Sequence, residues 1–417
     1  MSTIQSPLDA GHARAHFAFY DQASEDALSP VYLDSAATSH RPRVVTDAVL
    51  CGMTTRNANI HRASYRLAQA ATEAFEGARA TIGRFIGAPA QEVVFTKNAT
   101  EALNLLARCL PGADASWRLG AGKSVLLTEM EHASNVIPWQ MAASSVGAQV
   151  RFLPLTADGL LDLARLPELL DHTTQVVAIT HASNMVGTFN DLSPIIERAR
   201  EVGAVVVVDA SQSVPHRTVD VGSLGADFMV FTGHKMCGPT GIGVLWGRGD
   251  LLAALPPFLG GGDMFDDLTS EGMLAAAPPR RFEAGTPPLA EALGLAAAAD
   301  FLTRVGLANL HAHDQLLCAH AMERLHADPR IRILGPTDPA QRGSVVAFTV
   351  DGVDPGALAR LLDDRGIAVR AGQHCAQLAC RRLNVSSSVR LSTYLYNTVD
   401  EIDHLVNTIA TTLKETT

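Results

Sequence analysis

The chain has 417 residues, of which 47% are hydrophobic and 18% are charged, a composition that excludes a disordered or a fibrous protein. Its 33 basic and 43 acidic residues give a formal net charge of −10, which argues against nucleic acid or an anionic membrane surface as the main partner. Residues 1–30 lack a signal-peptide pattern, no apolar run is long enough to span a bilayer, and the six cysteines are scattered, so we expect a reducing, cytoplasmic location.

Short β-rich segments alternate with helical patterns through the middle of the chain. The four valines at 205–208 are apolar at every position, as a strand covered on both faces requires. The apolar stripe from Ala102 to Leu110 follows helical spacing. We expect strands at residues 92–96, 124–128, 149–153, 175–180, 204–208, 228–231 and 241–246. This alternation predicts a large α/β domain with a mainly parallel sheet.

The pattern changes after about residue 290. Helices are expected at 289–306, onward to about 326, at 355–365 and from 399, with strands at 344–350 and 367–370. These elements predict a smaller α+β C-terminal domain. We therefore expect a large domain at 31–290, a small one at 291–417, and an N-terminal arm at 1–30 that packs with the small domain.

Polar side chains follow five of the predicted strands at the point where each strand ends. Because ligands bind beyond the carboxyl ends of strands in open α/β sheets, we expect these side chains to surround one site. The segments are Lys97-Asn98-Ala99-Thr100, Glu129-Met130-Glu131-His132, His181-Ala182-Ser183-Asn184, Asp209-Ala210-Ser211-Gln212 and Thr232-Gly233-His234-Lys235.

Each of these residues also has a structural explanation when it is taken alone. Asp209 is at a position typical of a helix N-cap, and Asn98 likewise. Most lysines are solvated, so Lys235 alone indicates little. His132 could be a hydrogen-bonded core histidine.

Together the residues match the requirements of pyridoxal phosphate. This cofactor needs a lysine for covalent attachment, an anion beside its pyridine nitrogen and a cradle for its phosphate. Lys235 and Asp209 supply the first two from consecutive strand ends, and the helix start at Asn98–Thr100 supplies backbone N–H groups for the third.

The chain resembles the class V pyridoxal-phosphate enzymes, and within them the group II cysteine desulfurases of the SufS/CsdA type. The resemblance runs from about residue 30 to the C-terminus. It implies the type I pyridoxal-phosphate fold, which is similar to that of aspartate aminotransferase. The segments that carry it are 33–37 (LDSAA), 59–62 (NIHR), 130–132 (MEH), 180–184 (THASN), 208–212 (VDASQ), 232–241 (TGHKMCGPTG) and 281–287 (RFEAGTP).

The resemblance implies a role for each matching residue. Lys235 would carry the cofactor, His132 would stack on its ring and act in catalysis, Asp209 would pair with its ring nitrogen and Gln212 would touch its ring oxygen. The residues implied to bind the rest of the cofactor, chiefly its phosphate, are Ala99, Thr100, Thr232, His234 and Thr286. Those implied to bind the substrate are Asn184 and Arg390, which would hold its carboxylate, together with His61 and Ala36. The segments around His61 and Thr286 reach across a dimer interface in relatives, so a homodimer with shared active sites is expected.

Cys375 lies in Arg370-Ala371-Gly372-Gln373-His374-Cys375-Ala376, which resembles the segment that carries the nucleophile of the group II enzymes. Relatives often have a second histidine where this chain has Gln373, and a proline where it has Leu378. Cys375 could instead be a buried small hydrophobe. It could also form a metal site with His374 and Cys380, although only three ligands are visible and a structural zinc site needs four.

These observations predict an enzyme that converts L-cysteine to L-alanine and transfers the sulfur to Cys375 as a persulfide. An acceptor protein or thiol would receive the sulfur next, for iron–sulfur cluster or other sulfur-containing cofactor assembly. Three alternatives stay open at this point: a selenocysteine lyase or other C–S lyase, a class V aminotransferase or epimerase, and a cofactor-free sulfur-relay scaffold.

Overall fold

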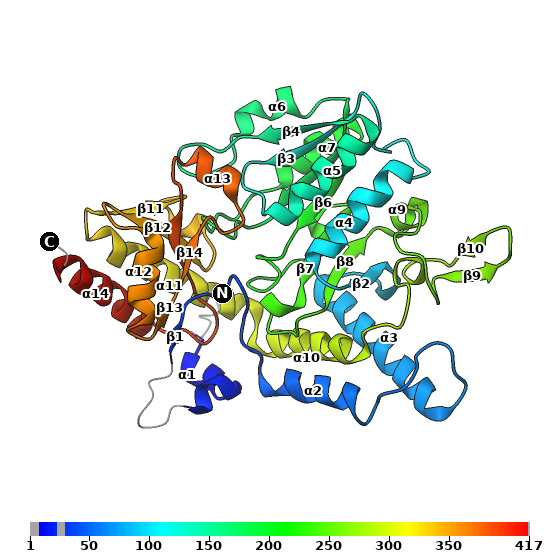
Figure 1. The fold of residues 1–417 in the computed structure, drawn as a ribbon, viewed down its shortest axis with the longest axis horizontal. Helices are drawn as coiled ribbons and strands as arrows, with labels where there is room; N and C mark the ends of the chain where they lie inside the picture. The colour runs from blue at the N-terminus through cyan, green and yellow to red at the C-terminus, as the bar shows by residue number, and fades with distance from the viewer. Residues whose placement is uncertain (1–7, 23–29, 416–417) are drawn as a thin grey trace, which may run out of the picture.

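The structure is a computed structural model that describes residues 8–22 and 30–415. Its largest element is a seven-stranded sheet (Figure 1). Strand β8 runs antiparallel to both of its neighbours, and every other pairing in the sheet is parallel. In spatial order the strands are β2 (Val93–Thr96), β8 (Gly243–Gly247), β7 (Phe228–Thr232), β6 (Val205–Asp209), β5 (Thr174–Thr180), β3 (Ser124–Thr128) and β4 (Gln149–Leu153). The prediction of a mainly parallel sheet is therefore confirmed.

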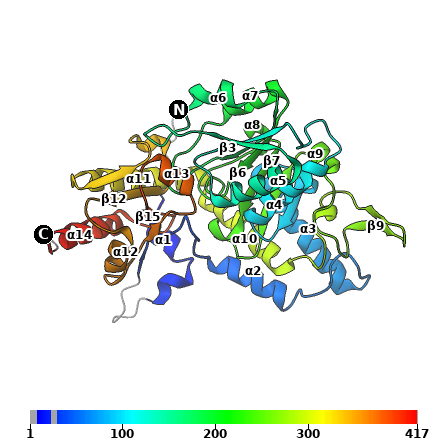
Figure 2. The ribbon, with the colours of Figure 1, turned by 45° about the horizontal axis from the view of Figure 1, so that its top comes forward.

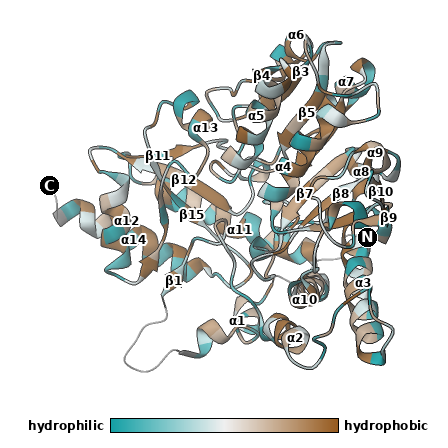
Figure 3. Ribbon diagram, turned by 45° about the vertical axis from the view of Figure 1, so that its right-hand side comes forward, coloured by the Kyte–Doolittle hydropathy of each residue, from teal (hydrophilic) through white to brown (hydrophobic). Residues whose placement is uncertain are grey.

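Helices cover both faces of this sheet, and alternate side chains of each strand supply the two cores. Val206 and Val208 of β6 belong to one buried cluster, and Val205 and Val207 belong to the other. The first cluster includes residues of α2 (Arg43–Met53), α3 (Arg66–Ile86), α7 (Ser193–Val202) and α10 (Leu289–Val305), and the second includes residues of α4 (Ala99–Cys109), α5 (Ile137–Val146) and α9 (Gly249–Ala254). The apolar colouring of the strands between the two helix layers reflects this double burial (Figure 3).

The large sheet carries several smaller elements. Short helices α6 (Leu166–Leu169) and α8 (Val221–Leu224) lie in the connections between strands. A hairpin of β9 (Phe265–Leu268) and β10 (Met273–Ala275) projects from the body of the molecule (Figures 1 and 2). The sequence patterns gave no indication of this hairpin.

The C-terminal part forms a second sheet of four antiparallel strands in the order β11 (Ile331–Leu334), β12 (Val345–Val350), β15 (Ser388–Ser392) and β14 (Arg370–Gly372). The segment expected as one strand at 367–370 is divided between two sheets, because β13 (Ile367–Ala368) pairs with β1 (Val31–Tyr32) whereas β14 pairs with β15. The helices of this part are α11 (Leu307–His326), α12 (Pro355–Asp363), α13 (Gln377–Arg382) and α14 (Val399–Glu415).

Helix α10 spans the domain boundary expected at residue 290. It packs against α2 and α3 beneath the large sheet, and so it is part of the core of the large domain. We propose a boundary nearer Gly306, where α10 meets α11 at a bend of 74°. No single helix among the described residues is long and apolar enough to cross a membrane; α10 and α11 meet that criterion only as this bent pair.

The described part of the N-terminal arm contacts both halves of the molecule. In α1 (Ala10–Arg14), Arg14 donates a hydrogen bond to the carbonyl of Tyr396 at 2.6 Å and pairs with Glu401. Phe17 is buried against Phe301 of α10 and the ring of Tyr396. Residues 1–7 and 23–29 of the expected arm lie outside the described residues.

Candidate active site

A cavity of about 230 Å³ lies at the edge where β2, β3, β5, β6 and β7 end, next to the four-stranded sheet. It is lined by predicted site residues from all five strand ends and from the small sheet: Ala36, Ala99, Thr100, His132, Asn184, Asp209, Gln212, Thr232, His234, Lys235 and Arg390. Ala99 and Lys235, which are 136 positions apart in the chain (235 − 99), meet here because parallel strands place their carboxyl ends at one edge.

Lys235 ends a tight turn that follows β7. A Cβ atom added at Gly233 would lie 2.9 Å from the carbonyl oxygen of Pro239, so glycine is required for this turn to close. Burial lowers the pKa of Lys235 to about 8, and the nearby carboxylate of Asp209 opposes that shift. A substantial fraction of the Lys235 amine is therefore neutral near pH 8, as a nucleophile or a base requires.

Asp209 ends β6, the strand next to β7, and is buried. One of its carboxylate oxygens accepts a hydrogen bond from the backbone N–H of Ser211 at 2.9 Å. The Gln212 side chain donates to the carbonyl of Ala36 at 2.9 Å, which ties this strand end to the segment after β1. Asp209 thus supplies a fixed carboxylate that lines the cavity together with Lys235.

His132 is held in a neutral form by its surroundings. Burial first, and then the charge of Lys235, lower its pKa to about 4. Its Nδ1 accepts a hydrogen bond from the backbone N–H of Ser134 at 3.1 Å, so the proton of the neutral ring is on Nε2. His132 can therefore stack on a ring and donate one hydrogen bond from Nε2 without adding a positive charge.

One end of the cavity has the composition of a phosphate cradle. Helix α4 begins there, capped by Asn98, which accepts a hydrogen bond from Glu101 N–H at 2.9 Å and leaves the first N–H groups of the helix available. The Thr100 and Ser134 hydroxyls lie 2.8 Å apart at this helix start. The buried Thr232 hydroxyl has no hydrogen-bond partner among the described residues. A donor left unpaired beside a helix start fits a bound phosphate, which would accept from it.

A glycine lets the strands approach the helix start closely. A Cβ atom added at Gly243, the first residue of β8, would lie 2.5 Å from the Cα of Asn98. His234 also borders the cavity, and burial lowers its pKa to about 4. A neutral His234 can donate a hydrogen bond to a phosphate but cannot form an ion pair with it.

Two arginines of the small sheet face the same cavity. Arg370 and Arg390 are directly opposite each other in the β14–β15 ladder, an arrangement in which like charges repel. Asp34 compensates part of this charge, because Arg390 Nη2 donates to its carboxylate at 2.6 Å. The Nε of Arg390 is buried and has no partner within the described part of the chain. This unpaired donor can bind a substrate carboxylate.

Asn184 lies beside Arg390, and both its backbone carbonyl and its side-chain amide form hydrogen bonds within the protein. Arg390 Nη1 donates to the Asn184 carbonyl at 2.9 Å. The Asn184 side-chain amide donates to the carbonyl of His374 at 2.6 Å. Asn184 therefore holds Arg390 and the segment before Cys375, in addition to lining the cavity.

Cys375 follows β14, and its side chain is half-buried. Its carbonyl accepts a hydrogen bond from Ala133 N–H at 2.7 Å, so the loop packs on the segment that carries His132. Its neighbour His374 lines the cavity, whereas Cys375 itself is not among the lining residues. No group of three potential metal ligands occurs in the described ranges, so the geometry gives no support to a metal site at His374, Cys375 and Cys380.

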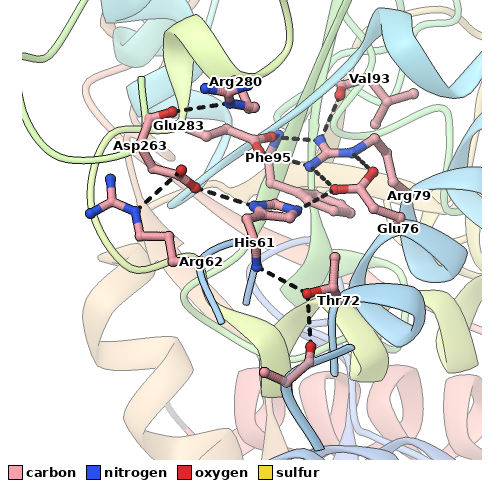
Figure 4. A network of polar contacts seen from close by, with 11 residues as sticks. His61, Arg62, Thr72, Glu76, Arg79, Val93, Phe95, Asp263, Arg280 and Glu283 are labelled. Carbon is pink, nitrogen blue, oxygen red and sulfur yellow. Dashed lines mark hydrogen bonds and ion pairs between the residues drawn. The ribbon is translucent and has the colours of Figure 1, made fainter. Parts of the chain in front are cut away.

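Like Cys375, the predicted residues His61 and Thr286 are not among those that line the cavity of their own chain. His61 lies between Glu76 at 2.9 Å and Asp263 at 3.2 Å (Figure 4). These carboxylates raise the pKa of His61. Thr286 lines a separate hollow beside the end of β2. The cavity of one chain is therefore built without either residue.

The network around His61 also holds the segment that leads to Thr286. Arg79 is buried and pairs with Glu283 at 2.6 Å and with Glu76 at 2.9 Å. Glu283 also accepts a hydrogen bond from Phe95 N–H at 2.6 Å. Figure 4 shows these side chains meeting between α3 and the loop that ends near Glu283.

The sequence patterns missed several residues that surround the cavity. Ser134, Ser211 and His374 line it without an assigned role, and Asp34 pairs with Arg390. Ser211 belongs to one of the strand-end segments but was given no role, and Ser134 follows a predicted strand by a few residues, so the same argument could have included it. Nothing local to Asp34 signals its partner 356 positions away.

Residues 31–405 match the family model described as aminotransferase class-V. The chain is 47% identical to a probable cysteine desulfurase of Streptomyces coelicolor over 98% of each chain. Among solved structures, the apo cysteine desulfurase of Thermococcus onnurineus superimposes with a TM-score of 0.92 at 34% identity over the full length of both chains. The cysteine desulfurase CsdA of Escherichia coli superimposes with a TM-score of 0.88 at 36% identity and covers 98% of this chain and 99% of its own.

Proposed function

The chain belongs to the class V aminotransferase family and is a pyridoxal-phosphate-dependent cysteine desulfurase with the type I fold, and on that premise we propose that Cys375 receives the substrate sulfur as a persulfide. We also assign attachment of the cofactor to Lys235, its ring nitrogen to Asp209 and its phosphate to Thr232, His234 and the start of α4. The observation that supports this proposal is that the groups assigned to the cofactor line one cavity, while the Cys375 loop packs on the segment that carries His132.

Each residue of the cavity has a separate role in the reaction. Bound pyridoxal phosphate supplies an electron sink for the negative charge that develops at the substrate's α-carbon. Arg390 binds the substrate carboxylate through its unpaired Nε and so orients the α-carbon. Lys235, with a pKa of about 8, removes the α-proton when its amine is neutral. His132 stays uncharged and donates a hydrogen bond to the bound substrate or cofactor through its Nε2–H.

Sulfur transfer is the step assigned to Cys375. Its thiolate attacks the sulfur of L-cysteine, so a sulfur–sulfur bond forms as the substrate's carbon–sulfur bond breaks. The carbon keeps the electron pair and takes up a proton, which gives L-alanine. The protein is left with a persulfide on Cys375.

A comparison of three proteins with L-cysteine tests this assignment. The wild type produces alanine and, with a reducing thiol present, an equal amount of sulfide. Cys375→Ser retains the cofactor but makes alanine at a rate reduced by orders of magnitude, whereas Lys235→Ala loses both activity and the cofactor's covalent attachment. Undiminished alanine production by Cys375→Ser would contradict the role of Cys375 and leave the role of Lys235 intact.

We further propose a homodimer with shared active sites. His61 and Thr286 lie outside the cavity of their own chain, and α2 exposes Leu50 and Met53, which are 60% and 62% accessible. Two exposed apolar side chains one turn apart on a helix are consistent with a surface that a partner covers. Sedimentation equilibrium should give twice the mass of the chain, and a monomer with full activity would contradict the proposal.

The persulfide is then passed, on this proposal, to an acceptor protein for iron–sulfur cluster or other sulfur-containing cofactor assembly in the cytoplasm. All six cysteines are unpaired, which fits a reducing compartment. Adding candidate acceptors to the alanine assay should raise turnover where transfer to an acceptor limits the rate. The rates with L-cysteine and with selenocysteine, compared in the wild type and in Cys375→Ala, distinguish this enzyme from a selenocysteine lyase.

A further inference from the structure

The loop that carries Cys375 has an unusual backbone. His374 has φ = 54° and Cys375 has φ = 56°, so two consecutive residues with side chains occupy the left-handed region. Gly372, two residues earlier, has φ = 127°. Left-handed conformations cost free energy for residues other than glycine, so surrounding contacts must hold this loop in place.

The large sheet holds the two strained residues by their carbonyl groups. The Asn184 side chain, after β5, donates to the His374 carbonyl at 2.6 Å. The backbone N–H of Ala133, after β3, donates to the Cys375 carbonyl at 2.7 Å. Both bonds cross from the large sheet to the small one, so they also fix the loop relative to the cavity.

The small sheet holds the same loop through the His374 ring. Its Nε2 lies 2.9 Å from the hydroxyl of Ser388, the first residue of β15. His374 and Ser388 are both buried, and Ser388 is fully inaccessible. Burial lowers the pKa of His374 to about 3, so its ring is neutral at working pH and Ser388 binds it as a dipole rather than as an ion.

We propose that Ser388, acting through His374, is a positioning residue that keeps the Cys375 sulfur aimed at the substrate. The proposal rests on the role of Cys375 proposed above. Ser388 fixes the ring, the ring fixes the backbone of His374, and Asn184 and Ala133 fix the carbonyls on the opposite side. Rotation about the Cys375 side chain is then the main freedom left to the sulfur, which suits a nucleophile that must meet one atom of a bound substrate.

Ser388→Ala removes the hydroxyl that contacts the His374 ring. The left-handed backbone of His374 and Cys375 then loses one of the contacts that hold it. The loop relaxes, so Cys375 becomes more exposed and less well aimed. Two effects of opposite sign follow: alkylation of Cys375 by iodoacetamide becomes faster, while kcat for alanine formation falls, each by about threefold to tenfold, the factor that one hydrogen bond of ordinary strength represents. KM and cofactor content stay at wild-type values, because Arg390 and Lys235 keep their contacts.

Peptide mass analysis measures alkylation at each cysteine separately. The wild-type protein, alkylated under the same conditions, is the reference for the rate at Cys375. Thr393→Val is the matched control, since it removes a buried hydroxyl just after β15 that has no partner among the described residues. Ser388→Thr keeps the hydroxyl and should restore both rates toward the wild type.

A double-mutant cycle identifies the path of the effect. If Ser388 acts through His374, then Ser388→Ala changes neither rate further in a His374→Ala background. If Ser388→Ala loses cofactor or fails to fold, His374→Phe, which keeps a ring but removes the hydrogen bond to Ser388 without changing β15, replaces it in the same two assays. Wild-type alkylation and kcat in Ser388→Ala, or an equal effect with and without His374, would overturn the proposal. The separate finding that Cys375→Ser keeps full activity would instead remove its premise.

Discussion

Replacing Lys235 by methionine should stabilise the cofactor-free protein. The amine is buried against the cavity wall, and burial lowers its pKa from 10.5 to about 8 although Asp209 partly compensates. A depression of that size corresponds to ~3 kcal/mol of unfavourable free energy for the charged amine in the folded state. Methionine has a similar length and no charge, so Lys235→Met should raise the free energy of unfolding by ~2–3 kcal/mol at pH 7.

The difference in free energy of unfolding between Lys235→Met and the wild type should change with pH in a defined direction. Between pH of about 8 and 10.5 the unfolded wild type binds the proton that the folded protein has released, so wild-type stability rises with pH in this window. The advantage of Lys235→Met is therefore complete below about pH 8, shrinks through this window and disappears above it.

Urea unfolding of cofactor-free samples, followed by far-UV circular dichroism between pH 7 and 10, measures the difference directly. Lys97→Met is the matched control, because Lys97 is an exposed lysine that also follows a strand of the large sheet. It should leave the free energy of unfolding unchanged. Equal stability of wild type and Lys235→Met at pH 7, or a difference that does not change with pH, would refute the electrostatic description of this site.

Three further substitutions test other parts of the structure. Thr232→Val removes the unpaired hydroxyl at the phosphate cradle and should weaken pyridoxal-phosphate binding by about 10-fold to 100-fold, measured by titrating cofactor-free protein. Arg390→Lys keeps the charge but loses the fork of the guanidinium, so KM for L-cysteine should rise by about 10-fold to 100-fold with a smaller change in kcat. Glu283→Ala removes one of the two carboxylates that pair with the buried Arg79. It should lower the free energy of unfolding, measured by urea unfolding, by ~3–5 kcal/mol.

Each of these substitutions has a control or a contradicting result. Thr393→Val removes an unpaired hydroxyl away from the cradle and should leave cofactor affinity unchanged. Glu168→Ala removes one partner of an exposed ion pair and should not change stability measurably. A Glu283→Ala protein as stable as Glu168→Ala would show that the Arg79 network does not hold the fold. An unchanged KM in Arg390→Lys would show that another group binds the carboxylate.

The strand ends could be predicted because local patterns determine them. The all-apolar run at 205–208 requires burial on both faces, and the two valine pairs do face separate cores. Once a mainly parallel sheet was expected, Asp209 and Lys235 had to lie at one edge. That step needs only the chain direction of neighbouring strands, which is why the cavity residues at strand ends could be named from the sequence, whereas Ala36 and Arg390 were implied by the family resemblance.

Features that depend on long-range pairing could not be predicted in this way. The opposition of Arg370 and Arg390 follows from the register of β14 and β15, which no local pattern fixes. The left-handed backbone at His374 and Cys375 contradicts the preference of both residue types, and contacts from two sheets maintain it. The positions of His61 and Thr286 outside the cavity likewise follow from tertiary contacts rather than from their own segments.

The most direct test of the account is the fate of the sulfur in a single turnover. Protein with bound cofactor is mixed with less than one equivalent of L-cysteine, quenched with an alkylating reagent and analysed by peptide mass, while alanine is measured in the same sample. We predict that Cys375 gains one sulfur atom for each alanine formed, and that Lys235→Ala forms neither product. Alanine formation with Cys375 unmodified, or with the sulfur on another cysteine, would contradict the account.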